Sequence, residues 1–164
     1  MFMGDKMKLA GWFSILLPFA VFVLDLALFR GNVKKSHVFR KIILLDYIGV
    51  ILYMTVLRRG IGTVHEINLH PFWSWVQSFQ PDIRWQIYMN IFLFLPLGFF
   101  LGWCYEFRFW KTILGGFLFS TVIETTQYIF CLGLCEVDDV IHNTLGTVIG
   151  YGYLSALSFV SGRK

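Results

Sequence analysis

The chain has 164 residues, of which 57% are hydrophobic and 15% are charged, and its mean hydropathy is +0.65. Soluble domains carry about one quarter charged residues, and no small soluble core would hide the eighteen Phe, six Trp and seven Tyr of this sequence. The composition therefore excludes an ordinary soluble domain and indicates an integral membrane protein, whose net charge of +4 is explained by topology and anionic lipids without a nucleic acid partner.

A membrane-spanning helix needs about 20 mostly apolar residues. Five segments approach that length: Leu9–Phe29, Ile42–Leu57, Ile87–Cys104, Phe109–Leu132 and Val140–Val160. The first is too long for the apolar region of a cleaved signal peptide and lacks a small-residue cleavage site. We therefore predict an all-α integral membrane protein with five transmembrane helices and no soluble appendage.

The distribution of Lys and Arg predicts the orientation, because short cytoplasmic loops are enriched in these residues. Nine of them fall on one side of the predicted topology: Arg30, Lys34, Lys35, Arg40, Lys41, Arg108, Lys111, Arg163 and Lys164. Five fall on the other side: Lys6, Lys8, Arg58, Arg59 and Arg84. We expect a multi-pass protein with its N-terminus outside the cytoplasm and its C-terminus inside.

Polar residues interrupt the last three predicted helices. Glu124 lies fifteen residues into its segment, about two thirds of the way across at a rise of about 1.5 Å per residue, and Gln127 follows on the same helix face. Asp139 and Asn143 share a face at the outer start of the fifth segment, and Asn90 lies at the outer start of the third. Ionisable groups inside a span are functional-site candidates, so we predict a polar site in the outer part of the bilayer.

Helix packing is the alternative explanation of this cluster. Polar side chains between membrane helices contribute about 0.6 kcal/mol each on average, and such a contact would account for Gln127 or Asn143 alone. It does not require both Glu124 and Asp139. If these two carboxyl groups converge, like-charge repulsion should keep one of them protonated near neutral pH.

The longest outer connection runs from Arg58 to Gln86 and contains the sequence INLHPFWSWVQSFQPD. Its apolar residues recur at helical spacing between two prolines, and its tryptophans favour the headgroup level of a membrane. We predict an interfacial helix over Pro71–Gln80 that caps the polar cluster. His65, Glu66 and His70 are the other outer groups able to exchange protons.

The remaining features predict packing rather than chemistry. Gly146 and Gly150 form a small-residue strip that allows close helix approach, and a homo-oligomer through this strip is one expectation. Asp25 lies near Arg30 at the inner end of the first segment, where ion pairing accounts for it. No cofactor or metal is expected, because the Cys and His spacing does not match a zinc site.

Four short motifs resemble the VanZ family of bacterial membrane proteins. In chain order they are NLHPF (Asn68–Phe72), NIFLFLPLG (Asn90–Gly98), ETTQ (Glu124–Gln127) and DDVIHNTLGTVIG (Asp138–Gly150). The resemblance covers about residues 46–152, so we divide the chain into an added N-terminal helix with a basic loop (residues 1–45) and a four-helix VanZ-like domain (residues 46–160). Some relatives carry an arginine shortly before the position of Glu136. Its absence here counts against an anion-binding role.

The resemblance implies a location in the bacterial cytoplasmic membrane and a role in resistance to lipoglycopeptide antibiotics of the teicoplanin type. A broader role would be recognition of an extracytoplasmic lipid-linked cell-wall component, with membrane lipids as further partners. The residues expected to bind the ligand are Asn68, His70, Asn90, Glu124, Gln127, Asp139 and Asn143.

Three functional hypotheses remain open. The first is a binding or protective module whose outer pocket engages an antibiotic, a lipid or a wall precursor. The second is a hydrolase or transferase acting on a lipid-linked substrate, with Glu124 and Asp139 as an acid/base pair. The third is a proton-coupled transporter. We favour binding, because the sequence has no nucleophile motif or metal set, and its five segments show no inverted repeat.

Overall fold

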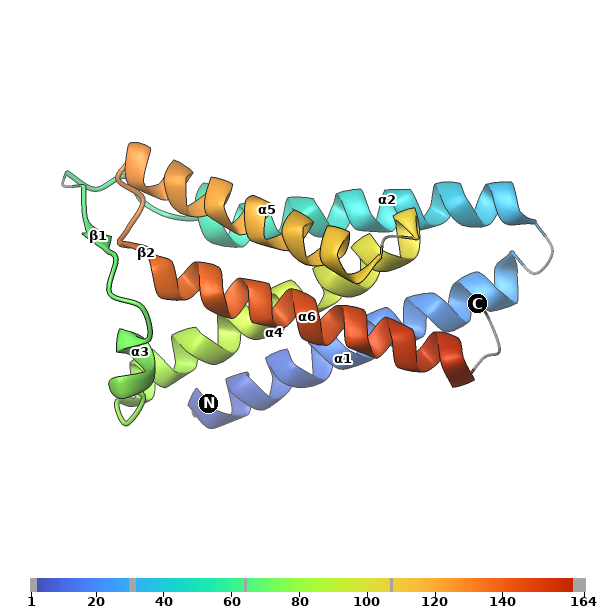
Figure 1. Ribbon diagram of the computed structural model, residues 1–164, viewed down its shortest axis with the longest axis horizontal. Coiled ribbons are helices and arrows are strands. Elements are labelled where there is room, and N and C mark those ends of the chain that lie inside the picture. Colours follow the sequence, from blue (N-terminus) through green and yellow to red (C-terminus); the bar gives the residue numbers. More distant parts are fainter. Residues whose placement is uncertain (1–2, 30–31, 64, 107, 161–164) are drawn as a thin grey trace.

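The structure, a computed structural model, describes residues 3–29, 32–63, 65–106 and 108–160, with the backbone alone described for residues 3–11. Its long helices in these ranges are α1 (Met3–Leu28), α2 (Val33–Leu52), α4 (Pro81–Tyr105), α5 (Phe109–Ile129) and α6 (Val137–Val160). Each overlaps one predicted segment, but α2 begins nine residues before the predicted Ile42, so that part of the predicted basic loop is helical. Successive long helices run in opposite directions along the molecule (Figure 1). The predicted helical class is confirmed.

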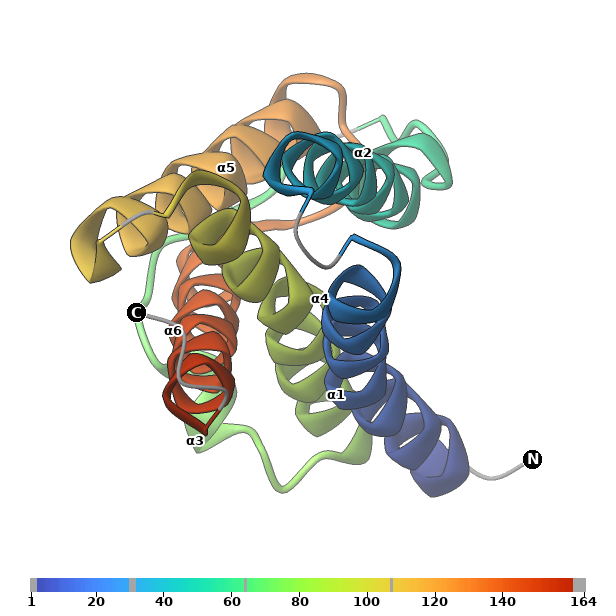
Figure 2. The same cartoon turned by 90° about the vertical axis from the view of Figure 1, so that its right-hand side faces the viewer.

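Helix α4 lies at the centre of the bundle and packs against every other long helix, most extensively against α6 (Figure 2). Its side chains Phe94, Phe99 and Phe100 are fully buried, and Ile51 of α2 joins them in the apolar core. This central position explains why the most continuous apolar stretch of the sequence belongs to α4.

Glycines bring α4 and α6 close together. A Cβ atom at Gly146 or Gly150 of α6 would overlap a backbone oxygen of α4, and one at Gly98 of α4 would overlap the backbone of α6. The small-residue strip is thus used for packing within the chain. A homo-oligomer through Gly146 and Gly150 stays a prediction, since no second chain is present.

Two loops meet at one end of the bundle, on the left of Figure 1. The first leaves α2 through a π-helical turn, η1 (Tyr53–Leu57), and contains strand β1 (Ile67–Asn68) and the short helix α3 (Trp73–Val76). The second, between α5 and α6, contains strand β2 (Cys135–Glu136), which pairs with β1 in parallel. The predicted interfacial helix over Pro71–Gln80 is therefore a single turn, braced by a strand pair that the helical pattern did not predict.

The bundle buries polar side chains and exposes apolar ones. On α5, Glu124 is 4% exposed and Gln127 is 1% exposed, whereas Leu118 is 52% exposed and Val122 is 61% exposed. A water-soluble protein rarely shows so many large apolar side chains to solvent. This distribution matches a helix bundle surrounded by lipid.

By length and composition, α4 is the one helix in the described ranges that is apolar enough to cross a membrane, and Trp12–Leu28 of α1 forms a shorter apolar segment. Five membrane-spanning helices are therefore not confirmed by this measure. The described apolar part of α1 is too short, and the remaining long helices contain polar residues, including Glu124 on α5 and Asp138 and Asp139 on α6.

Candidate functional site

The polar cluster predicted from the sequence lies at the bundle end where the two loops meet. Glu124 of α5 is buried and accepts a hydrogen bond from the backbone N–H of Glu136, at 3.1 Å from its Oε2 atom. Gln127, one turn further along the same helix, donates from Nε2 to the carbonyl oxygen of Thr55 at 2.9 Å. Helix α5 thus uses one face to hold both β2 and the π-helical turn.

Asn143 and Asp139 come to this cluster from α6. The Nδ2 atom of Asn143 donates to the hydroxyl of Ser120 on α5 at 2.8 Å. The half-buried carboxyl group of Asp139 lies within electrostatic range of Glu124, Glu136 and Arg59. Among the described residues no hydrogen bond joins Asp139 to Glu124. The two predicted carboxyl groups therefore interact through their charges and not through a direct hydrogen bond.

The other three predicted residues are placed less centrally. Asn68 lies at the edge of the cluster, where its Nδ2 atom is 3.5 Å from Oε1 of Glu136 and its Oδ1 atom accepts the backbone N–H of His70 at 3.1 Å. The His70 side chain is exposed, and Asn90 is half-buried on α4. In the described part of the chain no hydrogen bond brings the His70 ring or the Asn90 amide into the cluster.

Asp138 is a central residue that the sequence interpretation did not single out. Its carboxylate accepts the backbone N–H groups of Phe72 and Ser74, at 2.5 and 2.9 Å, and the hydroxyl of Ser74 at 2.5 Å. It therefore caps α3, which has no side-chain cap of its own. Phe72 has φ = 64°, an unfavourable value for a bulky residue, and the hydrogen bond from its N–H holds it there.

His142 and Trp75 form a second link between α6 and α3. The indole N–H of Trp75 donates to Nε2 of the buried His142 at 2.6 Å, and the two rings lie 5.9 Å apart. Together with Asp138, this contact fixes the short helix over the start of α6. The short helix thus contacts Asp138 and His142 of α6, and a cap over the four central cluster residues stays a prediction.

Arg59 provides a positive charge next to the acidic cluster. Its Nη1 atom donates to the carbonyl oxygen of Leu132 at 3.4 Å and lies beside Gly133, where an added Cβ would come within 2.6 Å of it. The guanidinium is within electrostatic range of Glu124, Asp139 and Glu136. The loop that follows η1 thus places an arginine next to the residues preceding Glu136, although no arginine occupies that segment of the sequence.

The loop groups have shifted proton affinities. Burial raises the pKa of Glu136, while the neighbouring N–H groups of Trp73 and Asn68 and the charge of Arg59 oppose the rise. Burial and the nearby carboxylates raise the pKa of the Cys135 thiol, which favours its protonated form. Among the described residues no three His, Cys, Asp or Glu side chains are placed to hold a metal ion.

A family comparison decides the classification. The family model described as VanZ/LLP1 matches residues 7–158, nearly the whole chain. The chain belongs to the VanZ family. Because the match begins at residue 7, it includes α1, which the four motifs had left outside the resemblance. No curated protein and no solved structure matches the chain.

Five buried polar side-chain atoms of this VanZ protein lack a hydrogen-bond partner among the described residues. Two are Nε1 of Trp73 and Oγ1 of Thr112, the latter near the far end of α5. The other three lie on α5 and α6 toward the cluster end. They are Oε1 of Gln127, Oδ1 of Asn143 and Nδ1 of His142. The two amides each use their NH2 group on the protein and leave the carbonyl oxygen free. The larger of the two described cavities lies at the opposite end of the bundle and is lined by other residues.

Proposed function

We propose that this VanZ protein is a multi-pass protein of the bacterial cytoplasmic membrane whose outer polar cluster binds the head group of an amphiphile. The ligand is a lipid-linked cell-wall component or a lipoglycopeptide antibiotic, and binding contributes to teicoplanin-type resistance or to envelope homeostasis. Ligand contacts would come from Glu124, Gln127, Asp139 and Asn143, with Asn68 at the edge.

Membership of the VanZ family and the apolar outer surface of the bundle support a membrane location. The alternating direction of the long helices supports five crossings. The described cations at the end opposite the cluster are Lys34, Lys35, Arg40, Lys41, Arg108 and Lys111, whereas Arg30, Arg163 and Lys164 lie outside the described residues. This excess of positive charge favours a cytoplasmic position for that end, which leaves the cluster outside.

The free acceptors of Gln127 and Asn143 carry the proposal. More than about 90% of buried polar groups in proteins have a hydrogen-bond partner, and an unsatisfied one costs about 1–3 kcal/mol. Both amides present oxygen, as do the carboxylates of Glu124 and Asp139. An array of acceptors suits a head group rich in hydroxyl, amide or ammonium donors, which describes sugars, peptides and glycopeptides better than a phosphate.

Ligand retention tests this function. Wild-type protein in detergent micelles would be incubated with teicoplanin or with a lipid-linked wall precursor, washed, and weighed by native mass spectrometry. Asn143→Leu and Gln127→Met remove the free acceptors at similar volume, and each should reduce retention about tenfold, the effect of losing about 1.4 kcal/mol. Thr112→Val is the matched control, since Thr112 is a buried polar residue near the other end of α5.

Two results would overturn the proposal. One is retention of neither compound by the wild type. The other is equal retention by wild type, Asn143→Leu and Gln127→Met, which would show that the unpaired amide oxygens do not contact the ligand. A loss of retention in Thr112→Val as large as in Asn143→Leu would also contradict a local site, because it would show that a buried polar residue far from the cluster matters equally.

The neighbouring carboxyl groups of Glu124 and Asp139 are the observation that favours catalysis as the second candidate. Each lies within the electrostatic range of the other, and an acid/base pair acting on a lipid-linked substrate needs two such groups. The distinguishing experiment is a search for products, which is described in the Discussion.

A further inference from the structure

A second site lies at the opposite end of the bundle, between α1, α2, α4 and α6. A cavity of about 630 Å³ opens there, within the size range of small-molecule sites. Its lining combines charged and polar side chains with an aromatic wall: Asp25, Ser36, Arg40, Trp103, Tyr151 and Ser155. None of these residues belongs to the cluster around Glu124, so the cavity needs a separate explanation.

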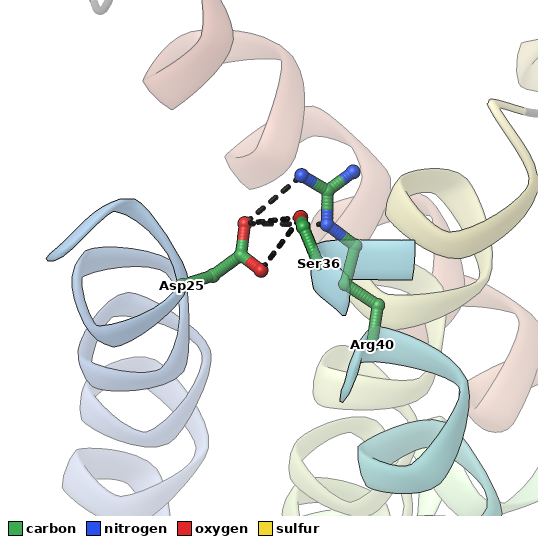
Figure 3. Close-up of polar contacts among 3 residues, drawn as sticks. All are labelled: Asp25, Ser36 and Arg40. Atoms are coloured by element: carbon green, nitrogen blue, oxygen red, sulfur yellow. Dashed lines mark hydrogen bonds and ion pairs between the residues drawn. The ribbon is translucent and has the colours of Figure 1, made fainter. Parts of the chain in front are cut away.

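Asp25 anchors the cavity wall through a closed set of polar contacts (Figure 3). Arg40 donates to its Oδ2 atom from Nη2 at 2.9 Å and from Nε at 3.3 Å. The hydroxyl of Ser36 lies 2.7 Å from Oδ1 and 3.0 Å from Oδ2. Asp25 is 2% exposed, and these donors satisfy its carboxylate, so it is not itself a free ligand group.

Arg40 is held in one orientation but keeps donors available. One edge of its guanidinium is bound to Asp25, and its face lies over the ring of Trp103 at 4.5 Å from the ring centroid. In the described part of the chain its Nη1 atom has no hydrogen-bond acceptor, and Arg40 lines the cavity. A guanidinium fixed in this way is preorganised for a phosphate oxygen.

The surroundings of Arg40 add positive charge and an apolar path. A shallower cavity of about 400 Å³ is lined by Phe29, Lys34, Lys35, Val38, Phe39 and Ile42. Phe29 lines both cavities, so the two adjoin. The lining of the shallow cavity is almost wholly apolar, and the two lysines that border it are exposed, which suits an acyl chain whose anionic head group lies beside the cavity. Glu106 is the one acidic lining residue besides the neutralised Asp25.

We propose that the cavity binds an anionic phospholipid, with its phosphate on Arg40 and one acyl chain in the adjoining groove. Basic pockets between membrane helices on the cytoplasmic side bind anionic head groups for the same electrostatic reason. This site differs from the outer cluster in its position and in the ligand that it would bind. It offers hydrogen-bond donors, whereas the cluster offers hydrogen-bond acceptors. It rests on the proposed function only for the membrane location of the bundle and for its orientation.

Native mass spectrometry of the full-length protein in detergent tests this site. Phosphatidylglycerol, phosphatidylcholine and diacylglycerol of the same chain length would be titrated separately, and soluble glycerol 3-phosphate would be added as a competitor. Phosphatidylglycerol should bind about tenfold more tightly than either other lipid, and glycerol 3-phosphate should not displace it. Equal binding of the three lipids, or displacement by glycerol 3-phosphate, would overturn the proposal.

Matched variants locate the binding. The double variant Asp25→Asn, Arg40→Gln removes the charge while keeping a hydrogen-bonded pair, and Ser155→Trp fills the cavity without touching the ion pair. Each should weaken phosphatidylglycerol binding about tenfold. Lys111→Gln removes an exposed cation that does not line the cavity and should have no such effect. If the double variant does not fold, Ser155→Trp decides, and unchanged lipid binding by it would refute the site.

Discussion

Asp138, in the first turn of α6, binds Ser74 of α3 through both the backbone N–H and the hydroxyl group, at 2.9 and 2.5 Å. The two residues are 64 positions apart. This contact ties the loop between η1 and α4 to the first turn of α6, the helix that also carries Asp139 and Asn143, so we expect the shape of the proposed outer site to depend on it. Asp138 acts as a cap supplied from a distant helix.

Asp138→Ala should therefore loosen the cap. Hydrogen bonds to a charged group contribute about 1.5–3 kcal/mol, so we expect the melting temperature to fall by roughly 5 °C. Hydrogen exchange at residues 72–76 should accelerate more than exchange in α4. Asp82→Ala is the control, because Asp82 is an exposed acid in the first turn of α4. An Asp138→Ala variant with wild-type exchange in α3 would contradict the capping role.

The pattern of the sequence predicted the long helices and the membrane class because hydrophobic runs and their lengths are local properties. It also predicted the convergence of Glu124, Gln127, Asp139 and Asn143 at one end, since the depth of each residue follows from its place in a helix of known rise. The depth of each of these four residues in the bundle depends only on its place within its own helix, which the local sequence defines.

The missed contacts are those between residues far apart in the chain. Nothing near Asp138 predicts a partner at Ser74, and Arg59 had been read only as a topological charge. Asp25 pairs with Arg40, a partner that the sequence did not predict, and the predicted partner Arg30 lies outside the described residues. One helical turn separates Ser36 from Arg40, so both reach the same carboxylate, but this requires the angle between α1 and α2 that the sequence does not specify.

The stability of the loop end should depend on pH through Glu136. Burial raises the pKa of this carboxyl group above its usual value, so the folded state binds its proton more tightly than the unfolded state does. The contribution to stability is therefore present at pH values below the unfolded pKa and is lost as the pH rises through the folded value. Glu136→Gln cannot ionise. Relative to this variant, the wild type should lose melting temperature as the pH rises above the ordinary pKa of a glutamate, whereas a constant difference would contradict the shift.

Cysteine labelling tests the orientation. In a chain whose three native cysteines are replaced by serine, Glu66→Cys at the cluster end should react with a membrane-impermeant maleimide added to intact cells. Lys35→Cys at the other end should react only after the cells are opened. Both side chains are exposed, so burial does not bias the comparison. The reverse pattern would place the cluster in the cytoplasm and remove the proposed extracytoplasmic ligands.

The carboxyl groups of the cluster should be essential for function. Glu124→Gln keeps an oxygen that can accept the N–H of Glu136, and Asp139→Asn is nearly isosteric, so both proteins should accumulate in the membrane at wild-type levels. We expect each variant to lose ligand retention and any protection against teicoplanin in a susceptible host. Thr125→Val, an exposed position on the same helix, serves as the control. Wild-type activity in both carboxyl variants would leave helix packing as the role of the cluster.

Binding and catalysis make opposite predictions for the fate of the ligand. A binding site needs the carboxyl groups of Glu124 and Asp139 only as hydrogen-bond partners, so affinity should change smoothly as one of them titrates. A general acid/base pair needs one protonated and one ionised group, which gives a bell-shaped dependence of the rate on pH. The unpaired oxygens of Gln127 and Asn143 would accept hydrogen bonds from a head group in the proposed site, but amide oxygens supply no nucleophile for catalysis.

Purified protein should therefore be incubated with bacterial lipid extract and wall precursors, and both the bound and the released molecules identified by mass spectrometry. We predict a retained, chemically unchanged ligand and no new product at any pH between about 5 and 9. Asp82→Asn would control for nonspecific loss of charge. A product that the wild type forms and that Glu124→Gln does not form would defeat the binding function, because turnover that depends on one buried carboxyl group requires that group to transfer a proton during the reaction.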